Sequence, residues 1–186
     1  MPCVAVIGKP RTGKTLFLTA IGYNDFLGQR KIFSNYNLSF KHQLYTLDDL
    51  LSISTMEMEL SPKTVLMQEA SKWFDARRSG RSENVLLSSF TGQSGKREID
   101  IYYDDQFMTR IDRGLRDITD YSFLSNLVKA PDGVTPLMFE YEMYYGYFVY
   151  PMNKTLRFPA FIMEKFYNMY KTREPTAPLI KNERED

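Results

Sequence analysis

Residues 8–15 read GKPRTGKT, and their types and spacing indicate a specific chemistry. Gly8 and Gly13 allow backbone conformations that other residues avoid, so successive N–H groups can converge on one anion. Lys14 adds a positive charge that reaches the β- and γ-phosphates of a nucleotide, and the hydroxyl of Thr15 can bind Mg²⁺. The pattern is typical of a loop that holds a nucleoside triphosphate. The residues predicted to bind the nucleotide are Gly8, Lys9, Pro10, Arg11, Thr12, Gly13, Lys14, Thr15 and Leu16.

The elements on either side of this loop strengthen the interpretation. Residues 3–7 form a short apolar run, which predicts a buried strand. Residues 15–26 carry apolar side chains at helical spacing, so a helix is expected to begin near Lys14. A strand, a glycine-rich loop and a helix in this order direct free N–H groups and the positive end of the helix dipole at the same anion.

The base of the nucleotide is predicted by elimination. Guanine recognition usually requires an N-K-x-D element, and the Asn-Lys pair Asn153-Lys154 is followed by Leu156 where the aspartate would stand. A GTPase is therefore disfavoured, and we expect ATP and Mg²⁺ as the cofactors.

A second acidic segment follows in the run TVLMQEA, residues 64–70. P-loop hydrolases place an aspartate associated with Mg²⁺ at the end of such a strand, often followed by a glutamate that orients the attacking water. Glu69 occupies the glutamate position, whereas Gln68 stands where the aspartate is expected. Since Gln68 carries no charge, it would contact Mg²⁺ only indirectly, and turnover is expected to be slow. The alternative for Glu69 is an acid in the first turn of a helix, favoured by the helix dipole.

The remaining pattern alternates strands with helices and predicts an α/β fold. We expect a mostly parallel sheet flanked by helices, with antiparallel strands added at one edge, where residues 121–150 are rich in strand-forming aromatic side chains. Aromatic residues at 141–150 are expected to pack an edge strand or a subunit interface, and a stacking surface is the alternative. The other predicted strands are 31–36, 64–67 and 99–103, and the other predicted helices are 47–53, 69–77, 83–90, 107–116 and 160–170.

Length and composition limit the classes of protein that remain. A chain of 186 residues suits a single domain, predicted over 1–172, with 173–186 as a mobile or partner-docking tail rich in proline and charge. The net charge of +1 excludes a global basic field as the basis of nucleic-acid binding. One cysteine permits no internal disulfide, and no signal peptide or membrane segment is evident. These features predict a cytoplasmic protein.

Basic residues are concentrated between residues 72 and 97, where six lysines and arginines are accompanied by two acidic residues. Such a patch suits the phosphates of DNA, because phosphate contacts need no sequence recognition. It equally suits contacts between subunits, and both alternatives stay open.

The run VLMQEASKWFDARRSGRSENVLLSSFTGQSGKREIDIYYDDQFMTRIDRGLRD, residues 65–117, resembles the zonular occludens toxin-like (Zot-like) ATPases of the FtsK–HerA superfamily. The loop at 8–15 and the stretch FSNYNL at 33–38 add to this resemblance. These ATPases occur in filamentous phages, archaeal viruses and integrated elements. The resemblance implies a RecA-like P-loop domain of the additional-strand type and a ring homo-oligomer, often a hexamer. It further implies double-stranded DNA and viral structural proteins as partners, in genome packaging, translocation or virion assembly.

The resemblance also implies roles for individual residues. Gln106 matches the family's sensor glutamine, although a polar residue at a helix start is the alternative. The implied catalytic residues are Lys14, Glu69, Gln106 and Arg97. The family uses an arginine from a neighbouring subunit against the transition-state charge, and a solvated surface role is the alternative for each candidate. The candidates for that arginine are Arg97, Arg77, Arg78 and Arg116.

Two other functions remain compatible with the sequence. Many P-loop kinases that act on small molecules such as nucleotides have this length, but the arginines lie near 69–77 and 106–116 rather than in an obvious lid. A nucleotide-dependent assembly scaffold with little turnover is the third possibility, because Gln68 replaces the expected acid.

Overall fold

The computed structural model describes residues 2–46, 49, 62–78 and 98–170, with the side chain of Arg78 left out. The helices expected at 83–90 and, apart from residue 49, at 47–53 lie outside these residues. The predicted tail at 173–186 and Arg97 lie outside them as well.

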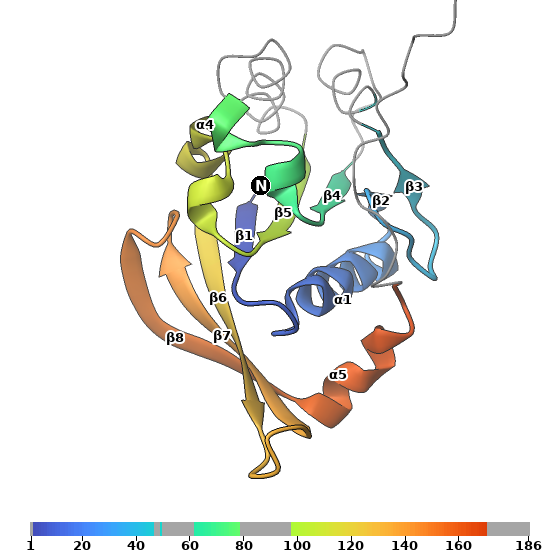
Figure 1. Ribbon diagram of the computed structural model, residues 1–186. Helices are drawn as coiled ribbons and strands as arrows, with labels where there is room; N and C mark the ends of the chain where they lie inside the picture. Colours follow the sequence, from blue (N-terminus) through green and yellow to red (C-terminus); the bar gives the residue numbers. More distant parts are fainter. Residues whose placement is uncertain (1, 47–48, 50–61, 79–97, 171–186) are drawn as a thin grey trace, which may run out of the picture.

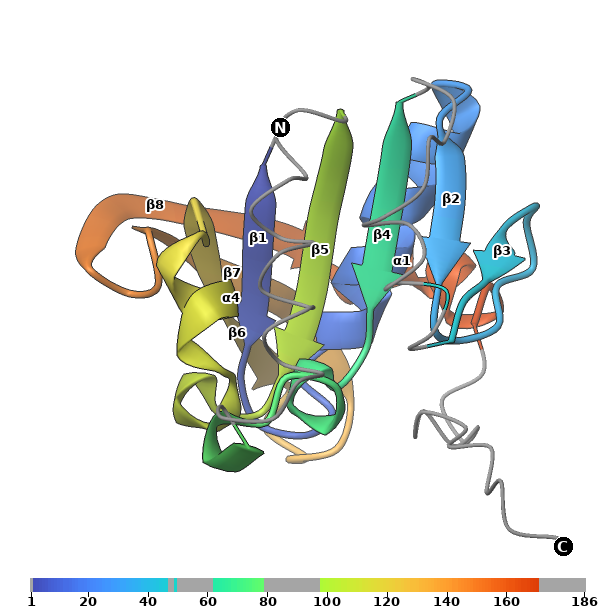
Figure 2. The same cartoon turned by 90° about the horizontal axis from the view of Figure 1, so that it is seen from above.

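One mixed sheet organises the described chain (Figures 1 and 2). Its strands are ordered β3-β2-β4-β5-β1-β6-β7-β8. Pairing is parallel from β3 to β6, and β7 and β8 then add antiparallel to β6. This confirms the predicted fold class, antiparallel edge included. The strands are β1 (Cys3–Ile7), β2 (Lys31–Ser34), β3 (Gln43–Leu44), β4 (Lys63–Met67), β5 (Ile99–Asp105), β6 (Tyr121–Lys129), β7 (Pro136–Tyr145) and β8 (Tyr150–Pro159).

Two apolar layers cover the sheet, as Figure 2 shows with α1 (Lys14–Leu27) behind the strands and α4 (Arg113–Asp117) in front. All five residues of β1 are buried, because alternate side chains enter opposite layers. Val4 and Val6 pack with α1 and with α5 (Ala160–Tyr167). Ala5 and its alternate neighbours pack with Leu115 of α4 on the other face.

Two expectations about local structure are wrong, and one strand was not predicted. The helix expected at 69–77 is replaced by two 3₁₀ turns, η1 (Ala70–Lys72) and η2 (Ala76–Arg78), because Glu69 has a left-handed backbone with φ 53°. The helix expected at 107–116 divides into η4 (Met108–Arg110) and α4, since Asp112 caps a new helix by accepting a hydrogen bond from the Gly114 N–H. Strand β8, which follows the region expected to be strand-rich, was not predicted.

The strand order places β5 between β1, which leads into the phosphate loop, and β4, which leads to Gln68 and Glu69. The parallel pairing brings the carboxyl ends of all three strands to one edge of the sheet, where Ile7 faces Asp105 and Met67 faces Tyr103. In the described part of the chain, no helix has the length and apolar composition that crossing a bilayer requires.

Candidate functional site

A cavity of about 700 Å³ opens at the carboxyl edge of the parallel strands. Its walls come from the loop after β1, from the chain after β4 and from the end of β5 and the residues that follow it. Polar strand-to-helix loops meet at this edge, which is where open α/β sheets generally bind ligands. Several of the residues predicted for the nucleotide site line it, including Lys14, Thr15, Gln68, Glu69 and Gln106.

The loop at 8–15 has the backbone that the sequence predicted. Gly13 is left-handed with φ 88°, and the first helical hydrogen bond of α1 runs from the Phe17 N–H to the Gly13 carbonyl at 2.9 Å. The N–H groups of Lys14, Thr15 and Leu16 therefore precede the helical ladder and lie at the positive end of the helix. The side chain of Leu16 is fully buried in the core, so its backbone alone can serve a phosphate.

Strands β6 and β7 pack closely against this loop. A Cβ at Gly8 would lie 2.4 Å from Ser125 Oγ of β6, and one at Gly13 would lie 2.5 Å from Phe139 Cδ1 of β7. The Tyr141 hydroxyl donates to the Gly13 carbonyl at 3.0 Å. Within the loop, Thr12 Oγ1 lies 2.6 Å from Ser125 Oγ. The two glycines are therefore required by close packing against β6 and β7.

The ammonium of Lys14 donates to the Lys9 carbonyl across the loop at 2.9 Å. Burial lowers the pKa of Lys14, while the negative charges of Asp104, Asp105 and Glu69 act to raise it. A lysine with this surrounding gains from an anionic ligand, because a phosphate adds opposite charge in a partly desolvated place.

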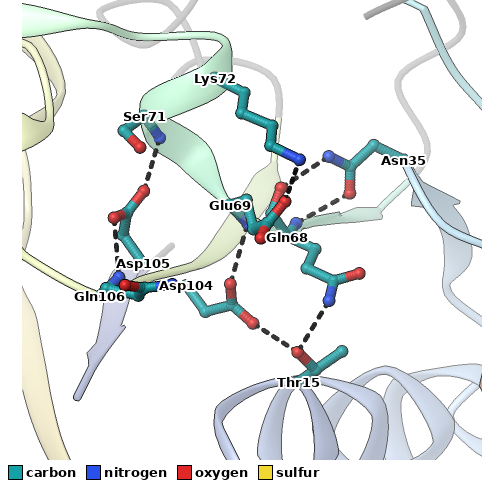
Figure 3. A network of polar contacts seen from close by, with 9 residues as sticks. All are labelled: Thr15, Asn35, Gln68, Glu69, Ser71, Lys72, Asp104, Asp105 and Gln106. Carbon is teal, nitrogen blue, oxygen red and sulfur yellow. Dashed lines mark hydrogen bonds and ion pairs between the residues drawn. The ribbon is translucent and has the colours of Figure 1, made fainter. Parts of the chain in front are cut away.

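The hydroxyl of Thr15 contacts two side chains, one from the end of β5 and one from the residue after β4 (Figure 3). It donates to Asp104 Oδ2 at 2.9 Å, and it accepts a hydrogen bond from the Gln68 side-chain amide at 3.2 Å. Gln68 therefore does reach the threonine expected to bind Mg²⁺. The carboxylate that reaches it comes from Asp104, which the sequence analysis missed.

Asp104 is 1% exposed, and burial raises its pKa to about 6. The hydrogen bonds from the Glu69 N–H and the Thr15 hydroxyl, together with nearby Lys14, act in the opposite direction and favour the charged form. The signal in the sequence that could have identified Asp104 was the pair of acids at the end of strand β5. Acids at the carboxyl end of a central parallel strand lie beside the phosphate loop.

Glu69 combines a strained backbone with two interactions. Its left-handed conformation turns its N–H toward Asp104 Oδ1, at 2.9 Å, and its carboxylate forms an ion pair with Lys72. Strained conformations of this kind persist where the surroundings fix them. Here Asn35, just after β2, contacts the backbone of Gln68 twice, by accepting from its N–H at 2.8 Å and donating to its carbonyl at 2.9 Å.

Asp105 performs a different task from its neighbour Asp104 (Figure 3). Its carboxylate accepts from the Ser71 N–H at 2.7 Å and from the Gln106 N–H at 2.7 Å. These contacts fix η1 and the start of the segment after β5. Gln106 itself is one of the residues that line the cavity.

Of the four predicted arginines, the structure describes the side chains of Arg77 and Arg116, and neither lines the cavity. Arg77 is 88% exposed at its side chain and pairs with Asp75 at 3.0 Å, and the guanidinium of Arg116 lies 5.6 Å from the centre of the Tyr147 ring. Among the described residues, Arg11 and Arg110 are the arginines that line the cavity. Arg110, which stacks 4.8 Å from the Phe107 ring centre, was not among the arginine candidates.

Within the described residues, no group of three or more His, Cys, Asp or Glu side chains is arranged to hold a metal ion by itself. A hydroxyl and a neighbouring carboxylate nevertheless suit Mg²⁺, which prefers oxygen ligands, keeps several waters and is usually shared with substrate phosphates. The oxygen groups at Thr15 and Asp104 fit this requirement.

No protein-family model matches the chain, and no curated protein sequence matches it. Its structure is similar to the N-terminal domain of zonular occludens toxin from Neisseria meningitidis, with 18% identity, a TM-score of 0.64, and coverage of 92% of this chain and 100% of that one. It is also similar to B204, the DNA-packaging ATPase from Sulfolobus turreted icosahedral virus, with 12% identity, a TM-score of 0.55 and coverage of 84% and 97%.

A further similar structure is the genome-packaging NTPase B204 from Sulfolobus turreted icosahedral virus 2 in complex with AMP, with 8% identity, a TM-score of 0.53 and coverage of 83% and 95%. At these identities the likeness shows the fold. The fold is that of P-loop NTPase domains, and this confirms at the structural level the resemblance found in the sequence.

Proposed function

We propose that this chain binds ATP with Mg²⁺ and hydrolyses it as a P-loop motor of the Zot-like and FtsK–HerA type. The observation that carries the proposal is the convergence of a phosphate loop, Thr15, Glu69 and Gln106 on one cavity, from three adjacent parallel strands. The likeness in fold to the packaging ATPase B204 supports the same conclusion.

The roles follow from the positions of the side chains. The N–H groups of the loop and Lys14 bind the phosphates, and Thr15 holds Mg²⁺, with Gln68 beside it as an indirect contact. When bound, Mg²⁺ neutralises charge on the β- and γ-phosphates. Glu69 orients and deprotonates the attacking water, after its carboxylate exchanges Lys72 for that water. Gln106 contacts the γ-phosphate, so that hydrolysis changes the contacts of the residue that follows strand β5.

The proposed cellular role is movement of double-stranded DNA in viral packaging or translocation, or assembly of virions with viral structural proteins, by a ring of identical subunits. In such a ring an arginine from the neighbour completes the site, and Arg97, Arg77, Arg78 and Arg116 stay candidates. The exposed side chain of Arg77 is compatible with reaching another subunit. Its ion pair with Asp75 would then be exchanged for the nucleotide.

The test is ATP hydrolysis with and without double-stranded DNA, at a protein concentration where the oligomeric state is recorded. We expect turnover that DNA stimulates and that both Lys14→Ala and Glu69→Gln abolish. Phosphoryl transfer to a nucleoside monophosphate would instead indicate a kinase. ATP binding without turnover would indicate an assembly scaffold, the second candidate, which Gln68 and the ion pair of Glu69 with Lys72 favour. Turnover that survives Lys14→Ala would contradict the proposal.

A further inference from the structure

The carboxylate nearest to Thr15 belongs to an unexpected strand. In the parallel register Met67 of β4 lies opposite Tyr103 of β5, so Gln68 and Asp104 are the next residues along the two strands. Both side chains reach the same hydroxyl for this reason (Figure 3). The expected acid is missing after β4, and an acid is present one strand closer to the phosphate loop.

The directions of the hydrogen bonds distinguish the two side chains. Thr15 donates its proton to Asp104, whereas Gln68 donates an N–H to the oxygen of Thr15. A hydroxyl that binds a cation turns a lone pair toward the metal and its proton away. An anionic acceptor for that proton strengthens the ligand and fixes its orientation. Asp104 supplies this acceptor, and Gln68 does not.

The other acids beside the cavity are engaged elsewhere. The carboxylate of Glu69 pairs with Lys72, and that of Asp105 accepts backbone N–H groups from Ser71 and Gln106. Asp104 also accepts one backbone N–H, from Glu69 through Oδ1, but its second oxygen faces Thr15. Among the acids of the described cavity wall, Asp104 is therefore the one whose contact leads to the proposed metal ligand.

We infer that Asp104 replaces the acid absent at Gln68, so that the carboxylate serving Mg²⁺ has moved from β4 to β5. Asp104 acts through the hydroxyl of Thr15 and through waters of the ion, and is therefore a positioning residue. Gln68 orients the same hydroxyl from the other side. The inference rests on the proposed binding of ATP with Mg²⁺, and it assigns to Asp104 the charge that Gln68 lacks.

The experiment measures the dissociation constant of a fluorescent ATP analogue in excess Mg²⁺ and in EDTA, and takes the ratio of the two. Wild type is compared with Asp104→Asn, with Gln68→Asp and with the double variant that carries both changes. Asp112→Asn is the matched control, since Asp112 is also buried but caps α4 and does not line the cavity. Thermal melting checks that each variant is folded.

We expect Asp104→Asn to reduce the effect of Mg²⁺ on affinity by about 10–100-fold, the usual loss when a residue that supports a metal ligand is removed. Affinity in EDTA should be retained, because the phosphate loop is intact. The double variant should regain the Mg²⁺ effect, since it returns a carboxylate to the same hydroxyl from β4. Asp112→Asn should keep it, and Gln68→Asp alone measures what a second carboxylate beside this hydroxyl adds.

A wild-type Mg²⁺ effect in Asp104→Asn would overturn the inference while leaving the proposed function intact. A loss of the Mg²⁺ effect in Asp104→Asn that the added Gln68→Asp does not restore would also overturn it. A carboxylate at residue 68 would then be unable to replace the one at residue 104. Wild-type protein that binds the analogue in neither condition would overturn the proposed function, and this inference with it.

Discussion

Two parts of the sheet, strands β1, β5 and β4 and strands β6 and β7, serve the candidate site in different ways. Strands β1, β5 and β4 end at the cavity, and the end of β5 and the segments that follow the three strands provide the side chains that can act on a ligand. Strands β6 and β7 provide no such group in the described structure, but they press Ser125, Phe139 and Tyr141 against the back of the phosphate loop. Further out, β8 is exposed along most of its length. The side chains that can act on a ligand and the side chains that support the phosphate loop therefore come from separate regions, which contact each other at Gly13.

The largest effect is expected from a substitution that disrupts the contact between the two regions at Gly13. Gly13→Ala would impose a side chain on a left-handed backbone and direct it against Phe139 and the Tyr141 hydroxyl. Strain and overpacking together should cost about 3 kcal/mol of unfolding free energy, measured by urea denaturation, and ATP binding should be lost.

Gly133 provides the control for this substitution. It is also left-handed, with φ 69°, but a Cβ there meets no atom within 4 Å. Gly133→Ala should therefore cost about 1 kcal/mol and leave ATP binding unchanged. Equal effects at the two glycines would show that the packing of β7 against the loop is unimportant.

A second prediction concerns the stability that the protein loses by burying the charge of Asp104 on strand β5. Burial raises the pKa of Asp104 to about 6 from an ordinary value of 3.8, so the folded protein holds this proton more tightly than the unfolded chain. Below about pH 4 the carboxyl is protonated in both states. Between about pH 4 and 6 the Asp104 carboxyl loses its proton in the unfolded chain but keeps it in the folded protein. The wild type therefore loses stability over this range, whereas a protein with an uncharged residue at this position would not.

Asp104→Asn should therefore stabilise the nucleotide-free protein by about 2–3 kcal/mol at neutral pH, a gain that develops between about pH 4 and 6 and disappears below that range. Denaturation at several pH values measures this difference, with Asp112→Asn as the control. A variant less stable than wild type at pH 7 would show that the hydrogen bonds of Asp104 outweigh the cost of burying its charge.

A third and smaller effect is expected at Tyr141, whose hydroxyl joins β7 to the loop. Tyr141→Phe keeps the stacking against Phe17, where the rings lie 4.2 Å apart, and removes the hydrogen bond to the Gly13 carbonyl. We expect a loss of about 1 kcal/mol in stability and a few-fold weaker binding of ATP. An unchanged affinity would mean that the loop holds its shape without this support.

The smallest effect is expected on the outer strand. Tyr150 is 67% exposed, so Tyr150→Ser should change stability by no more than about 0.5 kcal/mol and leave ATP binding unaffected. A large change in either quantity would place this strand among the functional parts of the molecule. A change confined to the oligomeric state, measured by light scattering, would support the subunit interface that the aromatic segment predicted.

The local sequence predicted much of this arrangement. The loop, its flanking strand and helix, and the strand before Gln68 follow from patterns contained within about ten residues each, so periodicity and glycine spacing suffice to predict them. The left-handed turn at Glu69 was not predictable in this way. It depends on Asp104 and Asn35, which lie more than thirty residues away in the chain and approach through strand pairing.

Asp104 was missed for the same reason. The sequence indicates that Gln68 cannot replace an acid, but only the strand order shows that β5 lies between β4 and β1. The register ends with Met67 opposite Tyr103, so Gln68 and Asp104 are the next residues along the chain after this pair. The residues that compensate for a departure from a familiar motif were therefore found in a neighbouring strand, where a search along the motif itself could not reach them.

The most direct test of the account is calorimetric titration of the purified chain with ATP and Mg²⁺, for wild type and for Lys14→Ala. The account predicts one nucleotide bound per subunit of the wild type, and binding reduced at least about 100-fold by the loss of the ammonium that contacts the phosphates. Equal binding by the two proteins, or binding by neither, would contradict the claim that the cavity after β1 holds a nucleoside triphosphate.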